Sequence, residues 1–146
     1  MIYLDTSALA SFLLGDANGP LVRDFVAREA PTLAVGDLAA AEFAAVVSRE
    51  VRTGGFDEAG GRDVLRTFDA WLAASAEALP TDPADLRVAV HFVRRFDLAL
   101  RAPDALHIAV CHRLGVPLLT FDARQAAAAR ALGVAVVPLG PAAGDA

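Results

Sequence analysis

Short apolar segments alternate with stretches of helical periodicity along most of this chain, and this alternation restricts the possible folds most strongly. The apolar segments occupy residues 2–4, 32–35, 116–121 and 134–137, with a weaker one at 76–79. Strands separated by helices are typical of a parallel sheet with helices on both faces. We therefore predict an α/β fold with a single domain over residues 1–137, followed by a loose Pro/Gly/Ala-rich tail over 138–146.

The charged residues exclude several classes of function. The chain has 146 residues and a formal net charge of −5, whereas proteins that hold nucleic acid mainly by their overall field are usually basic. All 13 basic residues are arginine. A Walker-type phosphate loop and Schiff-base chemistry both need a lysine, so neither is compatible with this sequence.

Cysteine content and the length of the apolar segments indicate where the protein works. Cys111 is the single cysteine, which excludes an internal disulfide and fits a reducing compartment. No apolar segment is long enough to span a bilayer, and the N-terminal residues do not resemble a secretory signal. We therefore expect a cytoplasmic protein with no membrane partner.

Two aspartates directly follow predicted strands. Asp5 follows residues 2–4, and Asp122 follows residues 116–121. Parallel strands place their carboxyl ends at one edge of the sheet, where open α/β folds bind ligands, so we expect these carboxylates to meet there. Each aspartate is also a good helix N-cap, and Asp122 with Gln125 matches a capping box. The two roles are compatible, because a carboxylate has two oxygens.

Two further acidic residues lie on predicted helices. Glu42 has leucine, alanine and valine at helical spacing around it, so its carboxylate needs either a cation or a partner such as Arg49. Asp104 follows Pro103 in the first turn of its helix, where the helix dipole already favours an anion. His107 lies one turn further on, and we interpret it as a packed or supporting residue rather than a ligand.

Carboxylates gathered in one place repel one another unless a divalent cation lies between them. The predicted metal site consists of Asp5, Glu42, Asp104 and Asp122. Ligands that are all oxygen suit Mg²⁺, with Mn²⁺ as the alternative, rather than zinc or copper. The hydroxyls of Thr6 and Ser7 either orient a carboxylate or a metal-bound water, or only occupy the first turn of a helix.

Four stretches of the sequence resemble the motifs of one enzyme family. They are Ile-Tyr-Leu-Asp5-Thr-Ser-Ala, Leu-Ala-Ala-Ala-Glu42-Phe, Arg-Ala-Pro-Asp104-Ala-Leu-His and Leu-Leu-Thr-Phe-Asp122. In this order, and over nearly the whole chain, they resemble PIN-domain ribonucleases. The resemblance is greatest to the VapC-type toxins of bacterial toxin–antitoxin pairs.

This resemblance implies a three-layer α/β/α sandwich with a central, mainly parallel five-stranded sheet. It implies a Mg²⁺- or Mn²⁺-dependent endoribonuclease that acts as the toxin of a type II toxin–antitoxin module. The four carboxylates named above, called the acidic quartet below, are then its catalytic and metal-binding residues. Thr6 or Ser7, and Thr120, match hydroxyl positions that support such a site. A homodimer and a small cognate antitoxin are implied in the same way.

A mechanism of this kind needs no lysine and no central histidine. We expect metal-bound water, lowered in pKa, to attack an RNA phosphodiester in line, while the same positive charge stabilises the departing oxygen. Substrate phosphates need a further cation, and Arg101, shortly before Asp104, is the best-placed candidate. Arg101 could equally be a solvated loop residue.

Two alternative functions remain open at this point. A metal-dependent phosphatase of the haloacid-dehalogenase type also uses an aspartate after its first strand. It usually needs a second aspartate two residues later, where this chain has Ser7. A non-catalytic, partner-binding α/β domain is the other alternative. The apolar residues that would line its groove, which equally suit a core or a dimer contact, are Phe43, Val47, Phe56, Phe68 and Trp71.

Overall fold

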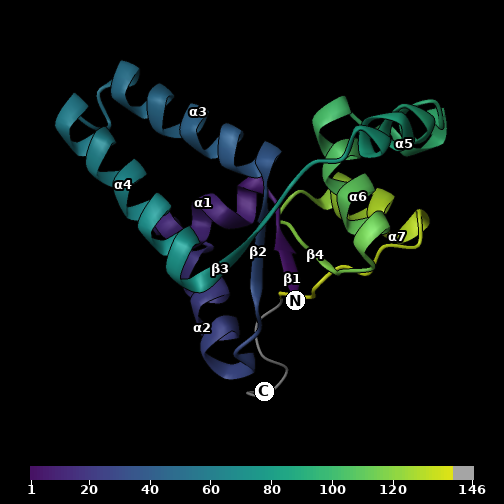
Figure 1. The fold of residues 1–146 in the computed structure, drawn as a ribbon, viewed down its shortest axis with the longest axis horizontal. Coiled ribbons are helices and arrows are strands. Elements are labelled where there is room, and N and C mark those ends of the chain that lie inside the picture. The colour runs from purple at the N-terminus through teal and green to yellow at the C-terminus, as the bar shows by residue number, and fades with distance from the viewer. Residues whose placement is uncertain (140–146) are drawn as a thin grey trace.

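A parallel sheet forms the centre of the molecule (Figure 1), and the computed structural model describes residues 1–139. The strands are β1 (Ile2–Leu4), β2 (Leu33–Gly36), β3 (Ala76–Leu79) and β4 (Leu118–Leu119). Their order across the sheet is β3-β2-β1-β4, and every pairing is parallel. Leu4 of β1 lies opposite Val35 of β2 and Leu119 of β4. The predicted α/β class with a parallel sheet is therefore confirmed.

Within residues 1–139 the sheet has four strands rather than the five expected. The segment predicted as the last strand, 134–137, forms a single parallel bridge between Val136 and Leu118. Gly133, at φ 80°, turns the chain immediately before this segment, and Pro138 follows it without an N–H to donate. Two backbone hydrogen bonds make this bridge, from the N–H of Leu118 to the carbonyl of Ala135 and from the N–H of Val137 to the carbonyl of Leu118, both at 2.8 Å.

Helices cover both faces of the sheet (Figure 1). They are α1 (Thr6–Leu14), α2 (Gly19–Glu29), α3 (Asp37–Thr53), α4 (Glu58–Ser75), α5 (Pro83–Val93), α6 (Ala102–Leu114) and α7 (Ala123–Ala131), with a 3₁₀ turn, η1 (Phe96–Leu98). Helices α1 to α4 lie on one side of the sheet and α5 to α7 on the other. The result is the three-layer arrangement that the sequence predicted.

The side chains of β1 alternate between these two sides, as those of a strand must. Leu4 packs into a core formed with α1, α3 and α4, whereas Tyr3 packs on the opposite side with α6 and α7. Asp5 comes directly after β1 and begins α1 as its N-cap. Both cores therefore meet at the strand whose carboxyl end carries the first predicted site residue.

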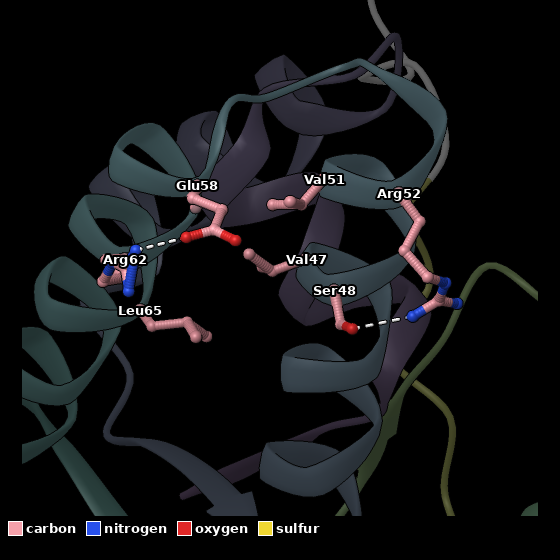
Figure 2. A pocket seen from close by; sticks show the side chains of 8 residues that line it. Val47, Ser48, Val51, Arg52, Glu58, Arg62 and Leu65 are labelled. Carbon is pink, nitrogen blue, oxygen red and sulfur yellow. Dashed lines mark hydrogen bonds and ion pairs between the residues drawn. The ribbon is translucent and has the colours of Figure 1, made fainter.

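Helices α3 and α4 form an antiparallel pair that extends beyond the sheet (Figure 1). Figure 2 shows a hollow between them, with Val47, Val51 and Leu65 on its walls. Its rim carries two polar pairs: Arg62 with Glu58 at 2.5 Å, and Arg52 Nη1 donating to Ser48 Oγ at 2.7 Å. The hollow is thus a packing feature of the helix pair with a solvated rim.

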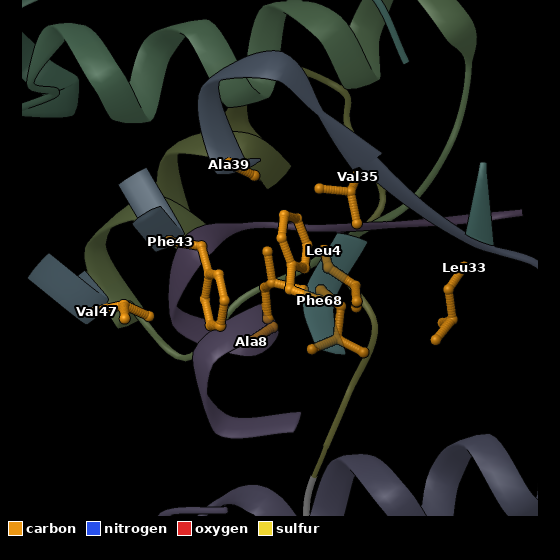
Figure 3. Close-up of a cluster of buried hydrophobic side chains, with 10 residues drawn as sticks. Leu4, Ala8, Leu33, Val35, Ala39, Phe43, Val47 and Phe68 are labelled. Atoms are coloured by element: carbon orange, nitrogen blue, oxygen red, sulfur yellow. The ribbon is translucent and has the colours of Figure 1, made fainter. Parts of the chain in front are cut away.

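The larger core contains the aromatic residues that the partner-binding alternative would need in a groove. Phe43 is fully buried and its ring centroid lies 4.9 Å from that of Phe68 (Figure 3). Val47 is buried beside them, and the rings of Phe56 and Trp71 pack against the same cluster. Burying side chains of this size stabilises the fold by about 1.5–3 kcal/mol each. Phe43, Val47 and Phe68 therefore belong to the core, and Phe56 and Trp71 lie partly buried at its edge.

A buried ion pair joins α5 to α6. Asp85 is 1% exposed and accepts two bonds from Arg113, from Nε to Oδ1 at 2.7 Å and from Nη2 to Oδ2 at 2.9 Å. Arg113 also donates to the carbonyl of Pro80, and Asp85 accepts the N–H of Asp82 in a capping box. Burial alone would raise the pKa of Asp85, but Arg113 holds it below its usual value. The pair fixes how α5 lies on α6.

The remaining expectations concern the chain end, Cys111 and the membrane. Leu139 lies in the tail that the sequence predicts to be loose and packs partly buried against the core, and residues 140–146 lie outside the described part. Cys111 is buried and makes no disulfide, and burial raises the pKa of its thiol. No helix in the described residues has the length and apolar character needed to cross a membrane.

Candidate active site

Asp5 is held at the carboxyl end of β1 by three hydrogen bonds. Its Oδ1 accepts from the N–H of Ala8 (2.9 Å) and from Ser7 Oγ (2.7 Å), while its Oδ2 accepts from Thr120 Oγ1 (2.6 Å). The residue is 4% exposed, and burial raises the pKa of its carboxyl despite these bonds. Asp5 is therefore the predicted helix cap and also a carboxylate whose charge a nearby cation would stabilise.

The hydroxyls of Ser7 and Thr120 connect β1 to the end of β4. Ser7 Oγ accepts the N–H of Phe121 (2.9 Å), and Thr120 Oγ1 accepts the N–H of Asp122 (3.0 Å). Each hydroxyl thus donates to Asp5 and accepts from the loop that carries Asp122. The two aspartates, 117 positions apart in the sequence, are brought to one edge of the sheet as predicted.

Glu42 of α3 is held by two residues from other elements. Its Oε2 accepts from Thr6 Oγ1 and from His107 Nε2, the latter at 2.9 Å. The hydrogen bond from His107 is the main reason why the pKa of Glu42 lies below its usual value. Arg49, the alternative partner considered from the sequence, instead lies 3.8 Å from Glu50. Thr6 is the residue after Asp5, so this contact brings Glu42 to the same edge.

Asp104 and Asp122 share one arginine. Arg101 Nε lies 3.3 Å from Asp104 Oδ2, and Arg101 Nη2 lies 3.7 Å from Asp122 Oδ2. Asp122 also caps α7, because its Oδ1 accepts the N–H groups of Arg124 (2.8 Å) and Gln125 (3.1 Å). The side chain of Gln125 contacts Thr120 rather than returning to the N-cap, so the predicted capping box is only half formed.

Electrostatics link the two halves of the site. The positive charge of Arg101, which contacts Asp104 and Asp122, also contributes to the lowered pKa of Glu42. All members of the acidic quartet thus lie in one charged neighbourhood at the carboxyl edge of the sheet. Arg101 supplies a counter-charge within that neighbourhood.

The carboxylates do not form a closed cage. Among residues 1–139, no three acidic, histidine or cysteine side chains come together closely enough to hold a metal ion by themselves. Mg²⁺ needs no such cage, since it usually keeps several waters and binds through one or two carboxylates. Glu42 Oε1 and Asp104 Oδ1 accept no hydrogen bond from the described residues, so each offers a free oxygen. The donor set therefore fits a hydrated Mg²⁺ or Mn²⁺.

The hollow between α3 and α4 is a poorer candidate. Its one acidic residue, Glu58, is paired with Arg62, and no histidine or cysteine lines it. It lies along the second half of α3, whereas Glu42 is in the first half. The sheet edge at Asp5 is the place where chemistry-bearing side chains meet.

A family model described as the PIN domain matches residues 2–131, which is most of the chain. This chain belongs to the PIN-domain family. The match decides against the haloacid-dehalogenase type of phosphatase as its fold family. No curated protein sequence matches the chain significantly.

Three solved structures share the fold of this chain. VapC20 from Mycobacterium tuberculosis, a sarcin–ricin loop cleaving toxin, aligns with TM-score 0.71 and 21% identity over 88% of this chain and 95% of its own. VapBC2 from Rickettsia felis, bound to a DNA fragment from its promoter, aligns with TM-score 0.70 and 13% identity over 94% of this chain and 98% of its own. FitAcB from Neisseria gonorrhoeae aligns with TM-score 0.66 and 18% identity over 94% of this chain and 97% of its own. At these identities the likeness establishes the fold.

Sequence reasoning missed one residue of this PIN-domain site. Tyr3 was treated only as part of a buried strand, yet its hydroxyl lies 2.8 Å from His107 Nδ1. The alternation of side chains along the strand could have indicated this contact. Tyr3 is the one residue of its strand that faces α6, where His107 lies among apolar neighbours. His107, which the sequence led us to interpret as a packed or supporting residue, contacts Glu42 and is 3% exposed.

Proposed function

We propose that this PIN-domain chain is a Mg²⁺-dependent endoribonuclease, with Mn²⁺ as a substitute, and the toxin of a type II toxin–antitoxin module. The observation that carries the proposal is the fixing of Asp5 and Glu42 by hydroxyl and imidazole groups at the carboxyl edge of the sheet. Hydrolysis of a phosphodiester requires catalytic carboxylates that are held in fixed positions, and these hydrogen bonds hold Asp5 and Glu42 in this way.

Each residue of the site has a role in this proposal. The acidic quartet would hold the ion directly or through its waters. A bound Mg²⁺ supplies Lewis-acid chemistry, since it lowers the pKa of water and stabilises negative charge on the leaving oxygen. Ser7 and Thr120 orient Asp5 by donating to both of its oxygens, and Thr6 holds Glu42.

Arg101 is the proposed contact to substrate phosphate. Its side chain is 68% exposed, and its two carboxylate contacts of 3.3 and 3.7 Å are longer than an ideal charged hydrogen bond. Such an exposed pair contributes little to stability, about 0.2–1 kcal/mol, so the guanidinium can turn to an RNA phosphate at small cost. Arg101 is therefore a counter-charge in the free protein and a phosphate ligand in the complex.

Cleavage assays with matched variants test this proposal. Structured RNA should be cut in Mg²⁺ and left intact in EDTA, and Asp5→Asn or Asp104→Asn should abolish cutting in proteins that stay folded. Asp63→Asn is the matched control, since it removes an exposed carboxylate of α4 that pairs only with Arg66. Cleavage that persists in EDTA would refute the metal mechanism. Release of phosphate from a small phosphomonoester without RNA cutting would favour a phosphatase.

A protein antitoxin is the proposed regulator, and the cytoplasm is the proposed compartment. Support comes from the structural neighbours, which include a toxin–antitoxin complex from Klebsiella pneumoniae with TM-score 0.59 and 15% identity over 82% of this chain and 85% of that one. A small protein encoded beside this gene should bind the purified chain and stop RNA cleavage. If no neighbouring product does so, the toxin assignment fails even though nuclease activity remains.

A homodimer is proposed as well. Large exposed apolar side chains gather along α5, where Leu86 is 55%, Val90 51% and Val93 36% exposed. They border an apolar groove whose floor includes Leu106 of α6, and a second copy would cover it. Light scattering should give a dimer for the natural chain and a monomer for Val90→Asp. A natural chain that stays monomeric at all concentrations would contradict this part.

A further inference from the structure

A buried polar pair lies behind the acidic edge and is not explained by packing. Tyr3 and His107 are 1% and 3% exposed, and their rings meet edge to face with centroids 5.7 Å apart and planes at 62°. The Tyr3 hydroxyl lies 2.8 Å from His107 Nδ1, while the other ring nitrogen, Nε2, lies 2.9 Å from Glu42 Oε2. The imidazole thus connects the interior of the protein to one member of the quartet.

The contacts allow only one arrangement of protons on a neutral His107. A carboxylate oxygen can only accept, so Nε2 must carry the hydrogen that Glu42 Oε2 receives. Nδ1 is then an acceptor and needs a donor. Tyr3 provides it, because burial raises the pKa of its phenol, which therefore keeps its proton at neutral pH. Tyr3 therefore completes the hydrogen bonding of the tautomer whose Nε2 hydrogen points at Glu42.

The position of the Tyr3 hydroxyl is itself restricted by Gly36. A Cβ placed on Gly36 would lie 2.5 Å from the Tyr3 hydroxyl oxygen, so no larger residue fits there without movement. Gly36 is also the N-cap of α3, the helix that carries Glu42. The close approach of Tyr3 thus ties the start of α3 to the same hydrogen-bond chain that ends on Glu42.

We infer that Tyr3 and His107 are positioning residues that hold Glu42 by Oε2 and thereby keep Oε1 available to the divalent cation. Oε2 already accepts from Thr6 and His107, whereas Oε1 receives no hydrogen bond from residues 1–139. Groups behind a metal ligand typically change metal affinity by about 10–100-fold when they are removed. The inference rests on the proposed metal-dependent function and adds two residues to its site.

The test measures Mn²⁺ affinity by electron paramagnetic resonance on the purified chain without RNA. His107→Ala and Tyr3→Phe should weaken binding by about 10–100-fold. His107→Gln should restore much of it, because its amide can still donate to Glu42. His91→Ala is the matched control, an exposed histidine on α5 that should leave affinity unchanged. Thermal unfolding monitors the fold of each variant, and Tyr3→Phe with His107→Gln decides the matter if His107→Ala does not fold.

A second measurement reads the hydrogen-bond chain directly. Imidazole ¹⁵N–¹H correlation spectra of the natural chain should show the Nε2–H tautomer for His107, and Tyr3→Phe should reduce its population. An Nδ1–H tautomer, or folded variants that bind Mn²⁺ as well as the natural chain does, would overturn the inference while leaving the nuclease proposal intact. A natural chain that neither binds Mn²⁺ nor cleaves RNA would overturn the proposed function and this inference together.

Discussion

Replacing Arg101 by alanine should affect metal binding and RNA cleavage in opposite directions. The guanidinium contacts Asp104 at 3.3 Å and Asp122 at 3.7 Å, so it neutralises two of the four carboxylates proposed to bind the cation. A divalent ion must compete with this charge. Arg101→Ala removes the competitor, and it also removes the proposed contact to substrate phosphate.

The exposure of Arg101 determines how large the gain in metal affinity should be. With 68% of its side chain in solvent, its ion pairs are screened and are together worth about 0.5–1 kcal/mol. That free energy corresponds to a Kd for Mn²⁺ lowered about 2–5-fold in Arg101→Ala. Loss of a charged hydrogen bond to phosphate costs about 1.5–3 kcal/mol, so kcat/KM for RNA should fall by about 10–150-fold.

Titration of Mn²⁺ by calorimetry and a fluorogenic RNA cleavage assay give these two quantities separately. Arg95→Ala is the matched control, since it removes an exposed arginine paired with Asp97 at 2.7 Å that belongs to no part of the site. The control should change neither quantity. Weaker Mn²⁺ binding in Arg101→Ala, or unchanged cleavage, would refute the idea that Arg101 competes with the cation and then binds substrate.

Three further predictions concern stability. Arg113→Ala leaves Asp85 buried without its partner. Because Arg113 is 34% exposed, we expect a loss of about 2–3 kcal/mol in the free energy of unfolding, less than for a fully buried pair, and a Tm lowered by about 6–10 °C. An unchanged Tm would contradict this prediction. Asp5→Asn should raise Tm in EDTA at pH 7, because the raised pKa of Asp5 means that ionising its carboxyl destabilises the fold as pH rises. At about pH 3 the carboxyl is protonated in both the folded and the unfolded chain, so the gain in Tm should vanish there. A gain in Tm that persists at this pH would argue against ionisation as the cause. Phe43→Ala should cost about 3–5 kcal/mol in urea unfolding, and a smaller loss would show that the core can close around the missing ring.

The fold could be predicted as far as it depends on local pattern. Apolar segments, glycines and aspartates mark where strands end and helices begin, and left-handed glycines end three helices, at Gly15, Gly54 and Gly115. The lengths of the last strands could not be predicted, because they depend on pairing partners. Pro117 cannot donate to a ladder, so β4 begins at Leu118, and it ends at Leu119 rather than at the expected residue 121.

The sequence predicted that Asp5 and Asp122 lie at one edge of the sheet, but it did not predict the contacts made by the candidate site residues. The apolar surroundings of Glu42 indicated that its carboxylate needs a partner, yet the nearest arginine along the helix is not that partner. His107 is, and it lies 65 positions away on another helix. From the sequence, Arg101 was either a phosphate contact or a solvated loop residue, and its pairing with Asp104 and Asp122 is seen only in the assembled structure. Periodicity reports which residues face inward, whereas partners across elements follow from tertiary packing.

The most direct test of the account is the position of a divalent ion on this edge. Crystals grown or soaked with Mn²⁺ should show an anomalous difference peak beside Asp5, Glu42, Asp104 and Asp122, within coordinating distance of at least one or two of these carboxylates and completed by waters. An anomalous peak elsewhere on the molecule, or none at Mn²⁺ concentrations that support RNA cleavage, would contradict it.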